Sequence, residues 1–265
     1  MERKPTALIT GASGGIGLEL AKLFARDGYN LALVARSHDR LKAIAEELER
    51  AHGIQVKYCT KDLAVTSTPD EIFQSIKSEM LDIDVLVNNA GFGWRGEFAR
   101  MELTEALEMI QVNITALTHL TRLLLPEMVR RGQGRILNVA STAAFQPGPL
   151  MATYYASKAY VVSFSMALAE ELAGSGVTVT AFCPGPTATG FGARAGFPSG
   201  KGFLSAISMD AATVARDGYR GMKKGKRLVV SGTMNWFGTQ LVRFLPRVLP
   251  GKLVKQYQKN RGTQL

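Results

Sequence analysis

Short apolar runs alternate along the chain with longer segments in which apolar residues recur at helical spacing. The apolar runs predict seven strands, at residues 7–10, 30–35, 55–59, 84–87, 134–140, 177–183 and 228–231. The periodic segments predict helices over 16–26, 40–52, 69–80, 102–131 and 154–173. This alternation favours an α/β fold, a doubly wound parallel sheet with helices on both faces. No repeat or low-complexity linker is visible, so we expect residues 1–265 to form a single domain.

Composition is that of a globular protein, with 46% hydrophobic and 20% charged residues. No apolar run reaches the roughly 20 residues of a membrane-spanning helix, and the first residues do not resemble a secretory signal. We therefore expect a cytoplasmic protein. Cys59 and Cys183 lie in apolar strand-like segments and are expected to be buried free thiols. The histidines are scattered and no CxxC occurs, so no metal site is predicted.

The net charge of +10 is unevenly distributed. Residues 220–265 contain eleven Lys or Arg and no acid, whereas the rest of the chain has 21 basic and 22 acidic side chains. A nearly neutral body argues against a nucleic-acid-binding domain, so no nucleic-acid partner is expected. The excess positive charge lies toward the C-terminus, so any anionic partner is expected to contact the basic C-terminal extension at 235–265.

This extension interleaves apolar and basic positions, and Pro246 and Pro250 are expected to interrupt any helix there. Three interpretations remain open. The extension can pack on its own domain or on a second subunit, it can close over a substrate cleft, or it can lie weakly on an anionic membrane surface.

A glycine-rich loop joins the first strand to the first helix. The uncapped start of a helix offers free N–H groups and a partial positive charge, which suit a pyrophosphate, and glycines let the phosphate approach. A purely structural turn is the alternative. The candidate phosphate-binding residues are Gly11, Ser13, Gly14, Gly15, Ile16 and Gly17.

The second strand ends in Arg36 without the carboxylate that would bind a ribose 2′-hydroxyl. Arg36 can instead pair with a 2′-phosphate, and Arg40 can assist from the following helix. This pattern favours NADP(H) over NAD(H). The alternative is that Arg36 is a solvated surface charge.

Tyr154 and Lys158 are four residues apart and share one face of a predicted helix. A neighbouring ammonium lowers the pKa of a tyrosine, so Tyr154 is expected to exchange protons with a reacting oxygen near neutral pH. Tyr155 is turned about 100° away. Ser141 ends the fifth strand, where ligands of such sheets gather, and its hydroxyl can hold a substrate oxygen.

Taken together, the glycine loop, Asn88-Asn89-Ala90-Gly91, Asn113, Ser141 and the Tyr154–Lys158 pair resemble the short-chain dehydrogenase/reductase family in order and spacing. The resemblance covers residues 6–189. It implies a Rossmann fold, a nicotinamide cofactor and a Ser–Tyr–Lys mechanism assisted by an asparagine. It also implies a homodimer or homotetramer formed through the helices at 102–131 and 154–173.

The same resemblance implies a role for each matched residue. Tyr154 is the acid in reduction and the base in oxidation, Lys158 holds the nicotinamide ribose, Ser141 positions the carbonyl, and Asn113 supports a water that relays the proton. Further cofactor contacts are implied at Asp62, Leu63, Asn89, Ala90, Gly91, Pro184, Gly185, Thr187 and Thr189. Thr187 stands where an aliphatic residue is usual, so backbone contacts are expected there.

Residues 190–208 follow the sixth strand and are rich in glycine and small residues, as expected of a mobile lid over a substrate. A plain surface loop is the alternative. Phe191, Phe197, Phe203 and Leu204 within it indicate an apolar substrate, although loop aromatics also pack loops down.

The sequence therefore predicts an NADP(H)-dependent oxidoreductase that acts on a small-molecule carbonyl or alcohol substrate. Its subgroup resembles bacterial ketoacyl and hydroxysteroid reductases. One alternative is a non-catalytic NADP(H)-binding sensor or scaffold, against which the complete Asn–Ser–Tyr–Lys set weighs. A second alternative is a membrane-surface-associated reductase of lipid-like ketones.

Overall fold

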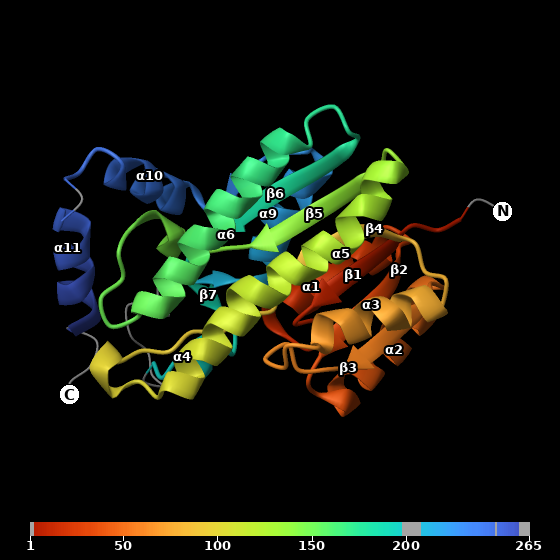
Figure 1. Cartoon of the computed structure of the whole chain (residues 1–265), viewed down its shortest axis with the longest axis horizontal. Coiled ribbons are helices and arrows are strands. Elements are labelled where there is room, and N and C mark those ends of the chain that lie inside the picture. Colours follow the sequence, from red (N-terminus) through yellow and green to blue (C-terminus); the bar gives the residue numbers. More distant parts are fainter. Residues whose placement is uncertain (1–2, 198–207, 247, 260–265) are drawn as a thin grey trace.

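The structure is a computed structural model that describes residues 3–197, 208–246 and 248–259. A seven-stranded parallel sheet with the order β3-β2-β1-β4-β5-β6-β9 forms its centre (Figure 1). This confirms the predicted doubly wound fold. The order reverses direction between β1 and β4, which creates the crevice where ligands of such sheets bind. The strands are β1 (Thr6–Thr10), β2 (Asn30–Ala35), β3 (Val56–Thr60), β4 (Ile83–Asn88), β5 (Gly134–Val139), β6 (Val177–Cys183) and β9 (Leu228–Val230).

Helices cover both faces because side chains alternate along each strand. Ala7 and Ile9 of β1 point to one face and pack with α1 (Gly15–Arg26), α2 (His38–His52) and α9 (Ala211–Lys223). Leu8 points to the other face, where the core includes residues of α3 (Thr68–Ser78), α5 (Ala116–Arg130) and α6 (Ala152–Glu171). Figure 1 shows α5 and α6 lying across β4, β5 and β6.

The helical patterning predicted over 102–131 is confirmed, but the helical segment is not uniform. The segment consists of α4 (Leu103–Ile110), a π-helical turn (Gln111–Thr115) and α5. The turn contains Asn113, whose side chain bonds to groups outside the helix rather than facing the usual helical neighbours. Such widened turns are frequent at functional sites.

Helix α9 was not predicted from the hydrophobic pattern. Asp210 caps it, since its carboxylate accepts a 2.7 Å hydrogen bond from the Thr213 N–H. The Tyr219 hydroxyl donates to the Asp27 carboxylate at 2.6 Å and so ties α9 to the end of α1. Before α9, the strands β7 (Thr187–Ala188) and β8 (Met209–Asp210) pair in parallel, and α7 (Phe191–Arg194) forms one helical turn.

The C-terminal extension forms α10 (Thr233–Val242) and α11 (Val248–Lys259), which lie at one end of the molecule (blue in Figure 1). The prediction that Pro250 interrupts a helix is wrong, because Pro250 lies in the first turn of α11, where an N–H has no helical partner to lose. Pro246 lies between the two helices, as predicted. None of the described helices is both long and apolar enough to cross a membrane.

The two cysteines are free thiols, but only Cys183 is buried, and Cys59 is partly exposed. The prediction of burial is therefore wrong for Cys59, because β3 is the edge strand of the sheet. No group of three or more His, Cys, Asp or Glu in the described part of the chain is arranged to hold a metal ion.

Candidate active site

A cleft of about 1060 Å³ opens at the carboxyl ends of the central strands. Most of the predicted site residues line it, although they come from segments more than 170 positions apart in sequence. They are Gly11, Ser13, Gly14, Gly15, Ile16, Arg36, Arg40, Asp62, Leu63, Asn89, Ala90, Gly91, Ser141, Tyr154, Lys158, Pro184, Gly185, Thr187 and Thr189. Gly17 and Asn113 do not line the cleft; they lie behind its wall.

The glycine loop forms a cradle at the start of α1. Gly11 (φ 67°) and Gly15 (φ 55°) adopt the left-handed conformation that favours glycine. No side chain caps α1, so its first N–H groups remain available to an anion. A Cβ on Gly17 would lie 2.4 Å from the Gly11 carbonyl oxygen, so this glycine packs the helix against the loop rather than contacting a ligand.

Asn89 fastens this cradle to β4. Its amide Nδ2 donates to the carbonyl oxygens of Thr10 at 2.9 Å and Gly11 at 3.2 Å. The Thr10 hydroxyl oxygen accepts 3.0 Å hydrogen bonds from the N–H groups of Asn89 and Ala90. These bonds hold Asn89 and Ala90, two of the residues with implied cofactor contacts, beside the phosphate loop.

Cationic side chains gather where β2 ends. The Arg36 guanidinium lies 3.7 Å from the Asp62 carboxylate, and Arg40 lines the same cleft. Arg194 of α7 stacks on the Phe92 ring, with its guanidinium carbon 4.2 Å from the ring centroid. Burial, and then the positive charge of Arg36, lower the pKa of Arg194. The guanidinium groups of Arg36 and Arg194 are therefore close enough to repel each other electrostatically in this part of the cleft.

Arg194 was missed by the sequence reasoning. Within the predicted lid, the hydrophobic pattern points only to apolar residues, although Arg194 is basic and lies between two of them, Phe191 and Phe197. Its position against Phe92 depends on a contact between residues about a hundred positions apart, which no local pattern shows.

Helix α6 carries Tyr154 and Lys158 into the cleft. The Lys158 Nζ donates to the Val139 carbonyl oxygen at 2.9 Å and lies 5.8 Å from the centroid of the Tyr154 ring. Ser141 hydrogen bonds to Tyr154 and also accepts a 3.1 Å hydrogen bond from the Ala143 N–H. The end of β5 and one face of α6 thus bring the three predicted groups together.

Burial controls the protonation of this group. It raises the pKa of Tyr154 to about 12, against the opposing effect of the Ser141 hydrogen bond. It lowers the pKa of Lys158 to about 8. The prediction that the neighbouring ammonium lowers the pKa of Tyr154 is therefore wrong for this structure, because desolvation of the phenolate dominates. Tyr154 is a protonated donor at neutral pH.

Asn113 acts on the site through the backbone of Phe92. Its Oδ1 accepts from the Phe92 N–H at 3.1 Å, and its Nδ2 donates to the Phe92 carbonyl at 2.9 Å and to the Ser157 hydroxyl at 3.0 Å. A Cβ on Gly91 would lie 3.0 Å from Oδ1 and 3.3 Å from the Lys158 Nζ. Asn113 is a positioning residue in this structure, and its support of a water remains a prediction.

Apolar side chains line the cleft, and one of them packs on the Tyr154 ring. The Phe191 ring lies with its centroid 5.1 Å from that of Tyr154, and Phe92, Met151 and Phe197 also line the cleft. Phe203 and Leu204, the other apolar lid residues of the prediction, lie outside the described residues.

The segment after β6 lines the cleft with Pro184, Gly185, Thr187 and Thr189. The Thr187 hydroxyl donates to the Gly185 carbonyl at 2.9 Å, so its side chain is already engaged. The Thr189 side chain packs close to Gly15 of the phosphate loop.

Comparison with known proteins shows the family to which the chain belongs. The sequence model of the short chain dehydrogenase family matches residues 5–196. The chain belongs to this family. Among solved structures, a short-chain dehydrogenase from Sphingobium yanoikuyae in complex with NADPH is 32% identical and superposes with a TM-score of 0.81, covering 90% of this chain and 93% of that one.

Two curated relatives match about two thirds of this short chain dehydrogenase. A ketoacyl reductase of Nostoc sp. is 37% identical over 68% of this chain and 62% of its own length. A very-long-chain 3-oxoacyl-CoA reductase of Phaeosphaeria nodorum is 38% identical over 65% of this chain and 52% of its own length. The match therefore spans about half to three fifths of the length of these relatives.

Proposed function

We propose that this short chain dehydrogenase transfers a hydride between NADP(H) and a carbonyl or secondary alcohol, with Tyr154 as acid and base. The observation that carries the proposal is the convergence of Ser141, Tyr154 and Lys158 in a cleft whose other wall is an uncapped helix start. The cleft fits a dinucleotide, since glycines occupy the positions where a Cβ would fill the cradle. A reduced nicotinamide bound there supplies the hydride.

The protein groups then divide the remaining work. The Ser141 hydroxyl donates a hydrogen bond to the substrate oxygen and fixes it for attack. The Tyr154 phenol gives its proton to that oxygen as charge develops on it. The Lys158 ammonium adds positive charge beside Tyr154, and Asn113 holds the Phe92 backbone that forms the adjoining wall. A phenol that is protonated at neutral pH can supply the proton that carbonyl reduction consumes.

The preference for NADP(H) rests on positive charge at the adenosine end of the cleft. Arg36, Arg40 and Arg194 all line it, whereas Asp62 is the carboxylate beside them. A 2′-phosphate carries negative charge that such guanidiniums bind through paired hydrogen bonds. The complex of the Sphingobium protein with NADPH supports the same assignment.

Arg36→Ala is expected to weaken NADPH binding by roughly 10–100-fold, the loss of a charge-assisted hydrogen bond, and to leave NADH binding nearly unchanged. Fluorescence titration of both cofactors measures this. Arg50→Ala, which removes an exposed arginine on the far side of α2, is the matched control. Equal losses for both cofactors would show that Arg36 does not bind the 2′-phosphate.

The pH dependence of cofactor capture follows from Lys158. Because burial lowers its pKa to about 8, the side chain is charged below this pH and neutral above it. We expect kcat/KM for NADPH to fall as the pH rises through about 8, and Lys158→Arg, which stays charged, to remove this fall. A profile that is flat to pH 9.5, about 1.5 units above this pKa, in the unaltered enzyme would contradict the assignment.

The substrate is proposed to be an apolar ketone, such as an acyl or polycyclic ketone. Phe92, Met151, Phe191 and Phe197 line the cleft around Tyr154, and the two curated relatives are named for ketoacyl and 3-oxoacyl substrates. Oxidation of NADPH, followed by its absorbance with 3-ketoacyl thioesters, polycyclic ketones and small polar ketones, tests this. Turnover confined to apolar ketones supports the proposal. Tight NADPH binding without turnover of any ketone would favour a sensor or scaffold.

We also propose a homo-oligomer built on α4 to α6. Leu103, Leu107 and Ile110 of α4 and Tyr160 and Met166 of α6 are large apolar side chains exposed to solvent. A second copy of the chain would cover them in the manner that the family resemblance implies. These side chains belong to α4 and α6, and none of them lies on α10 or α11.

A further inference from the structure

The outer face of α10 carries a stripe of apolar side chains that no described part of the chain covers. Met234, Phe237, Leu241 and Phe244 are spaced by three, four and three residues, which places them on one side of the helix and its C-terminal end. They are 82%, 63%, 63% and 85% exposed, respectively. The opposite side of α10 buries Thr239 against the domain. The stripe therefore faces away from the core that anchors the helix.

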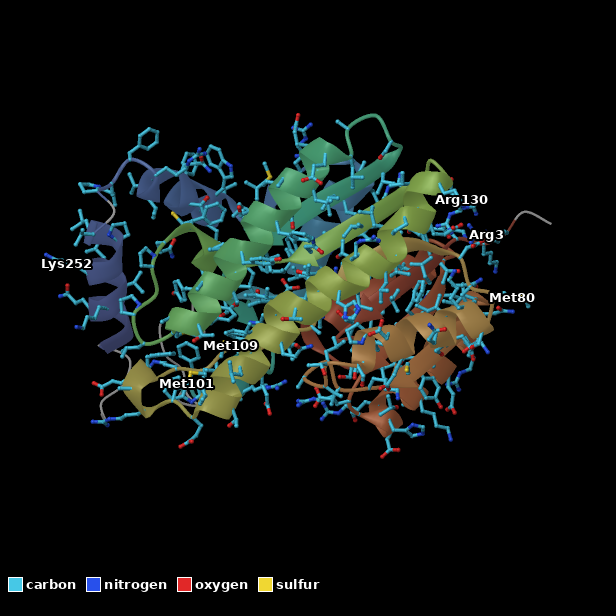
Figure 2. All side chains as sticks on the ribbon, in the orientation of Figure 1. Arg3, Met80, Met101, Met109, Arg130 and Lys252 are labelled. Carbon is cyan, nitrogen blue, oxygen red and sulfur yellow. The ribbon has the colours of Figure 1, made fainter. Side chains whose placement is uncertain are left out.

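Helix α11 continues this surface and adds charge. Val248, Leu249 and Leu253 are exposed, and Lys252 and Lys255 are interleaved with them. Figure 2 shows side chains of both helices projecting outward at this end of the molecule, with Lys252 at its edge. We call the exposed side chains of α10 and α11, with Arg243 between them, the tail surface.

No acidic residue occurs after Asp217 in the chain, so the tail surface has no carboxylate of its own segment to pair with its cations. A contiguous exposed apolar patch marks a binding surface. Its partner must accept apolar side chains and also supply negative charge. A second copy of the same surface supplies no negative charge and would be repelled.

We propose that the tail surface docks this protein on the anionic face of a phospholipid bilayer. Aromatic and aliphatic side chains enter the boundary between headgroups and acyl chains, and lysine and arginine bind the anionic headgroups. The helices lie along the membrane surface and do not cross it. Docking stands on this surface alone and does not require the proposed reductase activity.

The tail surface lies close to the cleft. Asn235 of α10 packs against Gly185, which lines the cleft, and Gly251 of α11 lies near Pro147, next to the cleft residue Gln146. A bilayer bound by α10 and α11 therefore lies beside the part of the cleft that Gln146 and Gly185 line. Lipid-derived ketones would enter from the phase in which they concentrate.

Co-sedimentation of the full-length protein with vesicles tests the proposal. We expect binding to vesicles of phosphatidylcholine mixed with phosphatidylglycerol, much weaker binding to pure phosphatidylcholine, and a decrease with added salt. The triple variant Phe237→Ser, Leu241→Ser, Phe244→Ser keeps the charge and should lose this binding. Val65→Ser with Met80→Ser, two exposed apolar side chains outside both the tail surface and the face of α4 to α6, is the matched control and should retain it.

The charge contribution is tested separately. Arg243→Gln, Lys252→Gln and Lys255→Gln together should weaken binding to the anionic vesicles by roughly 100-fold, given the attraction of each basic residue near such a surface. Lys42→Gln with Arg50→Gln, on α2, should have little effect. NADPH affinity and melting temperature, measured for every variant, show that each one is folded.

Two results would overturn the proposal. One is vesicle binding that is absent, or equal for the serine variant and the unaltered protein. The other is a fall in the molar mass measured by light scattering when the tail surface alone is changed, because the surface would then be an interface between copies. Neither result bears on NADPH oxidation in solution, so failure of docking is distinguishable from failure of the proposed function.

Discussion

Tyr154→Phe is expected to lower the rate of ketone reduction by roughly 10²–10⁴-fold, the usual contribution of a positioned proton donor. Phenylalanine keeps the ring that packs with Phe191 and Tyr155 and removes only the hydroxyl that hydrogen bonds to Ser141. NADPH affinity should therefore be preserved. Single-turnover oxidation of bound NADPH, followed by absorbance, measures the chemical step without product release.

Tyr155→Phe is the matched control for this change. The two tyrosines are adjacent, but Tyr155 faces Gly148 with its ring, and its hydroxyl is not the one beside Ser141. We expect the Tyr155 variant to keep most of the activity. Full activity in the Tyr154 variant, or equal losses in both, would remove Tyr154 from the role of proton donor.

Gly17→Ala is expected to disable cofactor binding without touching the cofactor. The added methyl group would lie 2.4 Å from the Gly11 carbonyl oxygen and 2.5 Å from the Asn89 Nδ2, so α1 and the phosphate loop must move apart. Overpacking of this kind costs about 1–3 kcal/mol of folding stability. Thermal unfolding of the cofactor-free protein, together with NADPH titration, should show both losses.

Gly14→Ala is the control for Gly17→Ala, because it adds a methyl group to the same loop without crowding other protein atoms. A Cβ on Gly14 meets no protein atom within 4 Å, and the extended backbone there suits any residue. The cofactor-free Gly14 variant should melt like the unaltered protein. If both variants melt alike, the close packing of Gly17 on the loop contributes nothing measurable to stability.

Much of the site could be predicted because a parallel sheet gathers the carboxyl ends of its strands at one edge. Arg36, Asn89 and Ser141 each follow a strand that the hydrophobic pattern located, so their convergence follows from the fold class. The four-residue spacing of Tyr154 and Lys158 fixes them on one face of α6 in the same way.

The remaining features depend on packing between distant segments. The pKa of Tyr154 is raised because the phenol is enclosed, and the sequence shows its lysine neighbour but not the walls around it. The π-helical turn at Asn113 depends on hydrogen bonds to Phe92 and Ser157, which lie 21 and 44 residues away. Helical periodicity cannot reveal such a local widening.

Helix α7 has a consequence for changing what this protein acts on. Its first residue, Phe191, contacts the ring of Tyr154, and its last, Arg194, lies against Phe92 within the electrostatic reach of Arg36. One helical turn therefore contributes to both the substrate wall and the cofactor end. Variants selected at this turn for a new ketone will also change cofactor affinity, so the two properties cannot be optimised independently here.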